Sequence, residues 1–204
     1  MTASTLTLFH NPQSRSAGVR VLLEALQAPY EIRLMDFKTG AQRSPEFLAV
    51  NPMGKLPTVR HGEAVVTEQV AIYLYLADLF PAVGLAPALD DPQRGPYLRW
   101  MAFYGSCFEP ALIDRAMKRE PADPSTSPYG DFDTMLGTFA GQLERGDYLL
   151  GDRMTAADIL WGSALRWTTE FGMVPALPVF TAYIARVCAH PAFARALALD
   201  AAGS

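Results

Sequence analysis

The sequence has little cysteine, little net charge and no long apolar run. Its only cysteines, Cys107 and Cys188, form no Cys-x-x-Cys pair, so we expect buried, reduced thiols and no metal site. The formal net charge of −4 gives no electrostatic reason to expect binding to nucleic acid or to an acidic membrane. No apolar stretch reaches the about 18 residues that a membrane helix requires, and no secretory leader is evident. We therefore expect a cytoplasmic protein.

Residues 1–81 carry a mixed pattern of strands and helices. The segments 6–9 and 30–34 alternate at period two and predict strands. Apolar residues between them recur at helical spacing, which predicts a βαβ unit with parallel strands. A short helix capped by Ser44, a hairpin turning near Gly62 and a further amphipathic helix follow. The order predicts one α/β domain.

The second part of the chain shows only helical patterns. Residues 82–91 form a proline-containing linker, and no convincing strand appears in residues 92–204. One apolar stripe at helical spacing comprises Tyr97, Trp100, Met101, Tyr104 and Phe108. Further on, Thr155 and Asp158 have the spacing of a capping box at the start of another helix. We expect an all-α second domain.

The segment Gly54-Lys55-Leu56-Pro57 precedes a β-branched run, which is unusual because proline cannot donate a ladder hydrogen bond. If the Leu56–Pro57 bond is cis, the Leu56 N–H and C=O point outward and can hold an extended peptide as an added strand. Glu68 and Gln69 then fall at a helix start, where free amides and the dipole favour an anion. Together these features suggest a clamp for a small peptide with a free amino end and a free carboxylate.

The chain resembles the cytosolic glutathione transferase family over essentially its whole length. The resemblance rests on the proline loop 54–57, on the acidic Glu68, and on the helix-capping signature Gly151 to Asp158. The segment 14–20 is similar to bacterial members that carry serine after the first strand. The resemblance implies a thioredoxin-like N-terminal domain, an all-α C-terminal domain, a homodimer, glutathione as co-substrate and no metal.

The resemblance also implies which side chain activates the glutathione thiol. A free thiol has a pKa of about 8.5, and lowering it by about two units requires roughly 2.7 kcal/mol. A helix N-terminus contributes only about 0.3–1 kcal/mol, whereas a hydrogen bond to a charged group contributes about 1.5–3 kcal/mol. A donor is therefore expected after the first strand. Alignment with serine-type members places Ser14 there, with Asn11 and Ser16 as alternatives.

The remaining site residues follow from the same resemblance. Leu56 and Pro57 would face the cysteinyl part of glutathione, and Glu68 with Gln69 its γ-glutamyl end. Gln69 departs from the serine usual in the family, although an amide can still donate to a carboxylate. The glycine carboxylate could be paired by Lys55, Lys38 or Gln42. For the electrophile pocket we expect the residues His10, Tyr104, Phe108 and Arg115, with core packing as the alternative for the two aromatic rings.

These features predict a glutathione transferase that presents glutathione as a thiolate to a small hydrophobic electrophile, in conjugation or peroxide reduction. The alternative is a non-catalytic glutathione-binding or regulatory protein on the same fold.

Overall fold

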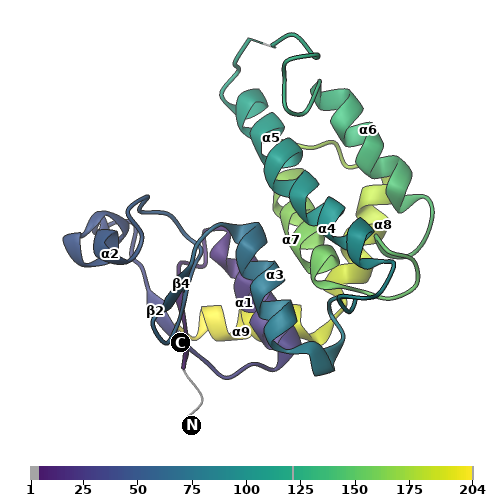
Figure 1. Cartoon of the computed structure of the whole chain (residues 1–204). Coiled ribbons are helices and arrows are strands. Elements are labelled where there is room, and N and C mark those ends of the chain that lie inside the picture. The colour runs from purple at the N-terminus through teal and green to yellow at the C-terminus, as the bar shows by residue number, and fades with distance from the viewer. Residues whose placement is uncertain (1–4, 121, 204) are drawn as a thin grey trace. The chain divides into compact units, whose positions relative to one another are not determined.

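The chain divides into two compact units. In the computed structural model, residues 5–120 and 122–203 are described. Unit 1 comprises Met1–Val83 together with His190–Ser204, and unit 2 comprises Gly84–Ala189. The elements of both units are labelled in Figure 1.

Unit 1 is built on a four-stranded sheet with the order β2-β1-β3-β4. Its strands are β1 (Leu6–His10), β2 (Tyr30–Leu34), β3 (Thr58–His61) and β4 (Ala64–Val66). The β1 and β2 strands are parallel, whereas β3 runs antiparallel to both β1 and β4. The register pairs Phe9 with Thr58, so the end of β1 and the start of β3 meet at the same edge of the sheet.

Helices cover both faces of this sheet. They are α1 (Ser16–Leu26), α2 (Pro45–Val50), α3 (Gln69–Leu79) and α9 (Pro191–Ala201), with short 3-10 turns η1 (Ala41–Arg43) and η2 (Pro81–Val83). The α1 helix packs against α3 and α9. On the opposite face, Phe47 of α2 packs with Phe9 and Met35 in a small apolar core, and Figure 1 shows α2 on that side. The predicted thioredoxin-like fold is confirmed.

The described residues of unit 2 form helices and no named strand, as predicted, apart from an isolated β-bridge between Tyr148 and Gly151. Its elements are α4 (Arg94–Phe103), a π-helical turn η3 (Tyr104–Phe108), α5 (Glu109–Ala116), α6 (Phe132–Leu143), α7 (Ala156–Glu170) and α8 (Pro178–Cys188). Trp161 of α7 lies at the centre of an aromatic core. Its ring stacks on Phe139 with centroids 3.9 Å apart, and its Nε1–H donates to the Trp100 carbonyl at 3.1 Å.

The predicted capping box at the start of α7 is present. The Thr155 N–H donates to the Asp158 carboxylate at 2.8 Å, and the Leu149 N–H and the Tyr183 hydroxyl donate to the same carboxylate at 2.9 and 2.8 Å. The carboxylate is fully buried, and these donors offset the cost of removing it from water. One buried acid therefore joins the start of α7 to α8 and to the preceding loop.

The unit boundaries differ from the expected domains in two ways. The expected linker, 82–91, mostly belongs to unit 2, where the Ala156 N–H donates to the Leu85 carbonyl at 2.7 Å. The last helix, α9, belongs to unit 1, because its apolar face packs on α1 and Arg195 pairs with Glu24 at 3.2 Å. Helical periodicity predicts that a helix has an apolar face but not which domain that face packs against.

Two further sequence expectations concern cysteine and membranes. Cys107 and Cys188 are both free thiols, but they are half-buried rather than buried. Of the helices within 5–120 and 122–203, none has the length and hydropathy needed to cross a membrane.

Replacing Gly162 by alanine is expected to destabilise unit 2 by about 1–3 kcal/mol, because overpacking a close contact forces its neighbours to shift. An added Cβ would lie 2.6 Å from Val187 Cγ1, at the contact between α7 and α8. Gly137 on α6 is the matched control, since its added Cβ would meet nothing within 4 Å. Gly137→Ala should stabilise by about 0.5–1 kcal/mol through helix propensity. Chemical denaturation measures both, and equal effects would contradict the close packing.

Candidate functional site

The proline loop is shaped by two buried polar side chains. Asn51 and Thr58 are almost fully buried. The Asn51 amide donates to the Lys55 carbonyl at 3.0 Å and to the Thr58 hydroxyl at 2.9 Å, and that hydroxyl donates to the same carbonyl at 3.0 Å. With the Lys55 carbonyl held inside the protein, the direction of the next peptide unit is fixed.

That next residue, Leu56, offers an unpaired donor and acceptor. The Leu56–Pro57 bond is cis. Within the described part of the chain, neither the N–H nor the C=O of Leu56 has a hydrogen-bond partner. Both groups are thus available to an extended ligand, which is the arrangement that peptide binding by strand addition requires.

Gly54 permits a close approach of this loop to the η1 turn. Its φ is +60°, and a Cβ there would lie 2.7 Å from the Gln42 carbonyl oxygen. Glycine is required on both counts. The side-chain Oε1 of Gln42 is buried without a partner among the described residues. Lys55 and Lys38 are exposed.

The α3 helix begins at Gln69, as the sequence predicts, and Glu68 is its N-cap. Glu68 has φ +61° and ψ +116°, a conformation that strains any residue except glycine. Its side chain is exposed. The Gln69 amide reaches the Arg15 carbonyl at 3.5 Å, so the start of α3 lies beside the segment that carries Ser14.

The segment between β1 and α1 holds a compact network of hydroxyls. The Ser14 and Ser16 Oγ atoms are 2.7 Å apart, and the Asn11 carbonyl oxygen lies 2.9 and 3.1 Å from them, so it can accept from either hydroxyl. Ser14 is half-buried, whereas Ser16 is fully buried. Asn11 has a scaffolding role, because its side-chain amide donates to the Met35 carbonyl at 2.8 Å.

His10 extends this network into the interior. Its ring is fully buried, with Nδ1 2.8 Å from Ser16 Oγ and Nε2 2.8 Å from Asp200 Oδ1 of α9. Arg20 of α1 forms an ion pair with the same carboxylate. Burial lowers the pKa of His10 and Arg20 acts in the same direction, against the hydrogen bond and charge of Asp200. His10 is therefore neutral at pH 7.

The other residues expected in an electrophile pocket make structural contacts. The rings of Tyr104 and Phe108 are buried against Trp161, and the Tyr104 hydroxyl donates to Glu109 at 2.5 Å. Arg115 stacks over Phe132 with its guanidinium carbon 4.2 Å from the ring centroid. These placements agree with the core-packing alternative for the two rings. A role for His10, Tyr104, Phe108 or Arg115 toward an electrophile stays a prediction.

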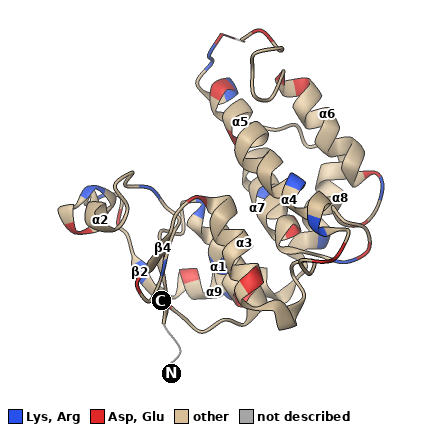
Figure 2. Cartoon of the chain, in the orientation of Figure 1, with Lys and Arg blue, Asp and Glu red and all other residues tan. Residues whose placement is uncertain are grey.

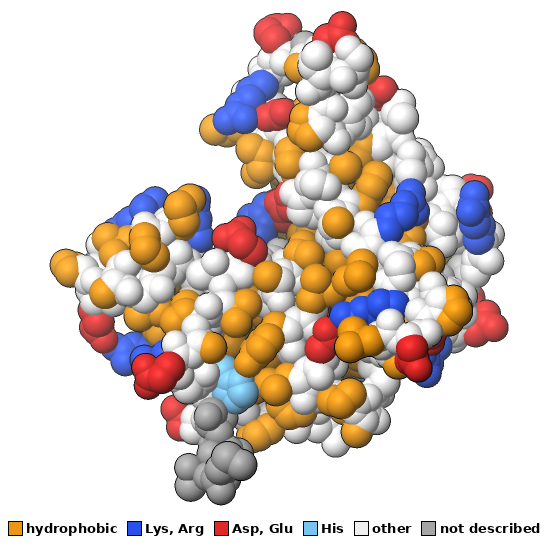
Figure 3. Space-filling model, viewed as in Figure 1, with side chains coloured by type: hydrophobic (Ala, Val, Ile, Leu, Met, Phe, Trp, Pro, Cys, Tyr) orange, Lys and Arg blue, Asp and Glu red, His pale blue; other side chains and the backbone are white. Residues whose placement is uncertain are grey.

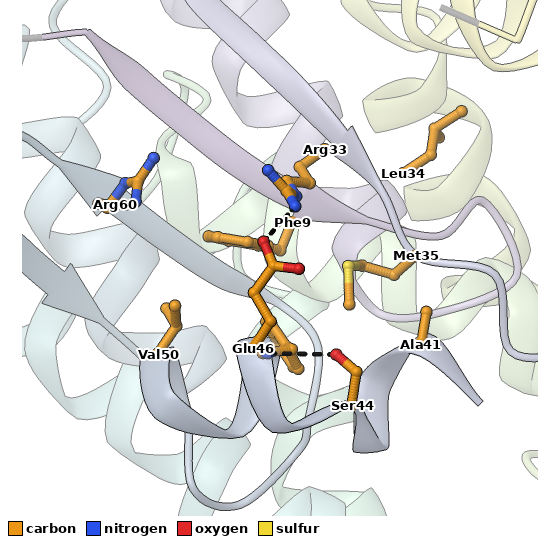
Figure 4. Close-up of a pocket in the computed structure, with 10 residues that line it drawn as sticks. Phe9, Arg33, Leu34, Met35, Ala41, Ser44, Glu46, Val50 and Arg60 are labelled. Carbon is orange, nitrogen blue, oxygen red and sulfur yellow. Dashed lines mark hydrogen bonds and ion pairs between the residues drawn. The ribbon is translucent and has the colours of Figure 1, made fainter.

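A cavity of about 160 Å³ lies elsewhere in unit 1, between the sheet and α2. Figure 4 shows two of its lining residues, Glu46 of α2 and Arg33 of β2, reaching toward one another in an ion pair. None of the residues expected to bind glutathione lines this cavity.

Surface charge gives no further candidate site. In the ribbon of Figure 2, positions of basic and acidic residues are scattered along the helices of each unit. Figure 3 shows charged side chains interspersed with apolar side chains on the face in view. Across 5–120 and 122–203, no group of three or more His, Cys, Asp or Glu residues could hold a metal ion.

Asp200 and Asn51 were missed by sequence reasoning. Asp200 is separated from His10 by 190 positions, and no local pattern links them. For Asn51 a signal existed, because its side chain can satisfy the backbone of a tight loop, and it directly precedes the proline-rich segment.

Comparison with known proteins agrees with this geometry. The model of the glutathione S-transferase N-terminal domain matches residues 4–78, and that of the C-terminal domain matches residues 130–191. Together they span both units, and the chain belongs to the glutathione transferase family.

Individual relatives are similar over nearly the whole length. A glutathione S-transferase of Xanthomonas campestris is 28% identical over 193 residues, covering 90% of this chain and 93% of that protein. The solved structure of a Methylococcus capsulatus glutathione transferase has a TM-score of 0.81 at 27% identity, covering 97% and 100% of the two chains. A Sulfitobacter homologue, solved with bound glutathione, has a TM-score of 0.77 at 25% identity, covering 98% and 99%.

The strain at Glu68 predicts an unusual stability change. Glu68→Gly is expected to stabilise the protein by about 1 kcal/mol, because relief of a strain of order 1–3 kcal/mol exceeds the entropy that glycine adds to the unfolded chain. Glu68→Ala is the matched control, since it removes the carboxylate and keeps the strained backbone. Thermal denaturation should show a higher midpoint for the glycine variant only. A gain in both variants would assign the effect to the carboxylate.

Proposed function

We propose that this protein binds glutathione and activates its thiol as a thiolate for attack on a small hydrophobic electrophile. One observation carries the proposal: three segments converge at one edge of the unit 1 sheet. The register of β1 against β3 brings the Ser14 segment and the proline loop to that edge, and Gln69 brings the start of α3 beside Arg15.

Each segment supplies a different part of the proposed binding. The unpaired N–H and C=O of Leu56 can pair with the cysteinyl backbone of glutathione. Glu68 would bind the γ-glutamyl amino group, and Gln69 with the α3 N-terminus would bind its carboxylate. Lys55 or Gln42 would hold the glycine carboxylate. The Sulfitobacter homologue was solved with bound glutathione, which supports glutathione as the ligand.

Ser14 is the proposed donor to the sulfur. It is less buried than Ser16 and lies just before α1, where the helix dipole also favours a negative charge. The Asn11 amide donates to the Met35 carbonyl, and Asn11 and Ser16 stay the alternative donors. Conjugation is the proposed reaction, with peroxide reduction as a second use of the same thiolate.

The oligomeric state, the cellular location and the electrophile site are also proposals. The family relationship supports a homodimer and a cytoplasmic location. The residues proposed to contact an electrophile are still His10, Tyr104, Phe108 and Arg115. The non-catalytic alternative is less favoured, because the Xanthomonas campestris relative, similar over nearly the whole chain, is named a glutathione S-transferase.

Replacing Ser14 by alanine is expected to lower kcat for conjugation about 10- to 100-fold, because a hydrogen bond to a charged group contributes about 1.5–3 kcal/mol. Glutathione affinity should change little, since the binding groups remain. Stopped-flow kinetics and titration calorimetry measure the two quantities separately.

Ser44→Ala is the matched control. Ser44 caps α2 by accepting from the Phe47 N–H at 3.2 Å, so its loss should cost about 1 kcal/mol of stability and no activity. Unchanged turnover in Ser14→Ala together with loss in Asn11→Ala would show that the donor is misassigned. Absence of binding heat at millimolar glutathione would overturn the proposed function itself.

A further inference from the structure

The hydroxyls of Ser14 and Ser16, the ring of His10 and the carboxylate of Asp200 form one continuous hydrogen-bonded chain. Its three links measure 2.7, 2.8 and 2.8 Å. Ser16 and His10 are fully buried, and the Asp200 side chain is 12% exposed. The chain runs from the half-buried Ser14 into the interior of unit 1.

In the free protein, the direction of donation along these hydrogen bonds follows from the chemistry of the carboxylate and the ring. The Asp200 carboxylate can only accept, so the Nε2 of His10 carries the proton and donates to it. In neutral His10 the Nδ1 atom is then an acceptor, and it receives the Ser16 hydroxyl proton. Ser16 Oγ accepts from the Asn11 N–H at 3.0 Å and can accept from Ser14. The Ser14 proton therefore points inward, toward Ser16 or the Asn11 carbonyl.

This direction conflicts with the role of a thiolate donor. To donate to a sulfur anion, the Ser14 hydroxyl must turn its proton outward and must itself accept from Ser16. Ser16 can supply that proton only if it no longer donates to His10. The conflict disappears when His10 is protonated on Nδ1, because every hydroxyl along the chain then reverses.

We propose that the His10–Asp200 pair is the acceptor of the glutathione thiol proton, which reaches it through Ser14 and Ser16. The proposal rests on the proposed function. In the step, the S–H bond breaks and Ser14 Oγ takes its proton. Ser14 passes its own proton to Ser16, and Ser16 passes its own to His10 Nδ1. The products are a thiolate that accepts from Ser14 and an imidazolium paired with Asp200, so the total number of protons and the total charge are unchanged.

The electrostatics suit a temporary acceptor. In the free protein, burial and the nearby Arg20 lower the pKa of His10 and keep it neutral, whereas the hydrogen bond and the charge of Asp200 favour the imidazolium. A negative charge on the sulfur then favours the imidazolium. Asp200 on α9 and Arg20 on α1 are the charged groups that face the ring, while Leu34 is its partner on β2. Beyond Arg20, the Tyr30 hydroxyl receives a 3.4 Å hydrogen bond from it and donates to Glu24 at 2.7 Å.

The experiment is nitrogen-resolved NMR of the histidine rings in the full chain, with the His10 signal assigned by its loss in His10→Gln. Glutathione at neutral pH should convert His10 from the Nε2–H form to the doubly protonated form. S-methylglutathione, which lacks the thiol proton, should bind and leave His10 neutral. Binding heat measured in parallel shows that each ligand occupies the protein.

Three other outcomes are decisive. If glutathione binds and His10 stays neutral, the proton relay from the thiol through Ser14 and Ser16 to His10 is overturned, and the proposed function stands. If both ligands protonate His10, the thiol is not the source of the proton, and the relay is again overturned. If glutathione does not bind, the proposed function fails and the relay fails with it.

Variants give a second readout. Asp200→Asn removes the charge that stabilises the imidazolium and should raise the pKa of the bound thiol by about one unit, which lowers turnover at neutral pH about tenfold. Turnover should recover at higher pH, with KM for glutathione little changed. Glu24→Gln is the matched control, because Glu24 also joins α1 to α9, through Arg195 at 3.2 Å, but lies outside the relay. A pH profile that shifts equally in both variants, or in neither, would contradict the proposal.

Discussion

Burying a histidine at the end of the central strand requires a partner for each ring nitrogen, and much of unit 1 is arranged to meet that requirement. One nitrogen of His10 contacts Ser16 in the first turn of α1, and the other contacts Asp200 in the last turns of α9. The Arg20 ion pair offsets the cost of placing the Asp200 carboxylate beside the core. A single imidazole thereby joins β1, the first helix and the last helix, and it fixes the backbone of the segment that carries Ser14.

The proline loop, which leads into the neighbouring strand β3, is also held by buried polar side chains. There an amide and a hydroxyl, both buried, hold the Lys55 carbonyl inward, and the neighbouring Leu56 keeps its backbone groups unpaired. In both places, internal polar contacts fix the geometry of an outward-facing group. A group held in this way loses little conformational freedom when it meets a ligand, which favours binding and catalysis alike.

Features that depend on residues close together in the sequence could be predicted, whereas those that depend on contacts between distant residues could not. Alternation located β1 and β2, and the spacing of Ser44 and of Thr155 with Asp158 located two helix starts, because these signals depend on neighbours in sequence. The aromatic stripe through Trp100 was predicted, but sequence alone could not choose between core and pocket for Tyr104. The domain of α9 and the partner of His10 depend on contacts between residues about 190 positions apart, for which periodicity has no signal. Ser14 was predicted from the resemblance to the family, whereas its hydrogen-bonded connection to Asp200 is visible only in the three-dimensional structure.

The membership of α9 in unit 1 has a consequence for how the chain folds during synthesis. The ribosome releases all of unit 2 before it releases the helix that completes unit 1. Until then, the α1 surface that α9 covers is exposed to water and His10 has no carboxylate partner. The helical unit, continuous in sequence, can fold first, as chain segments generally do in the order of their synthesis. The last helix then completes the first unit, so the unit that begins the sequence is the last whose residues are all available for folding.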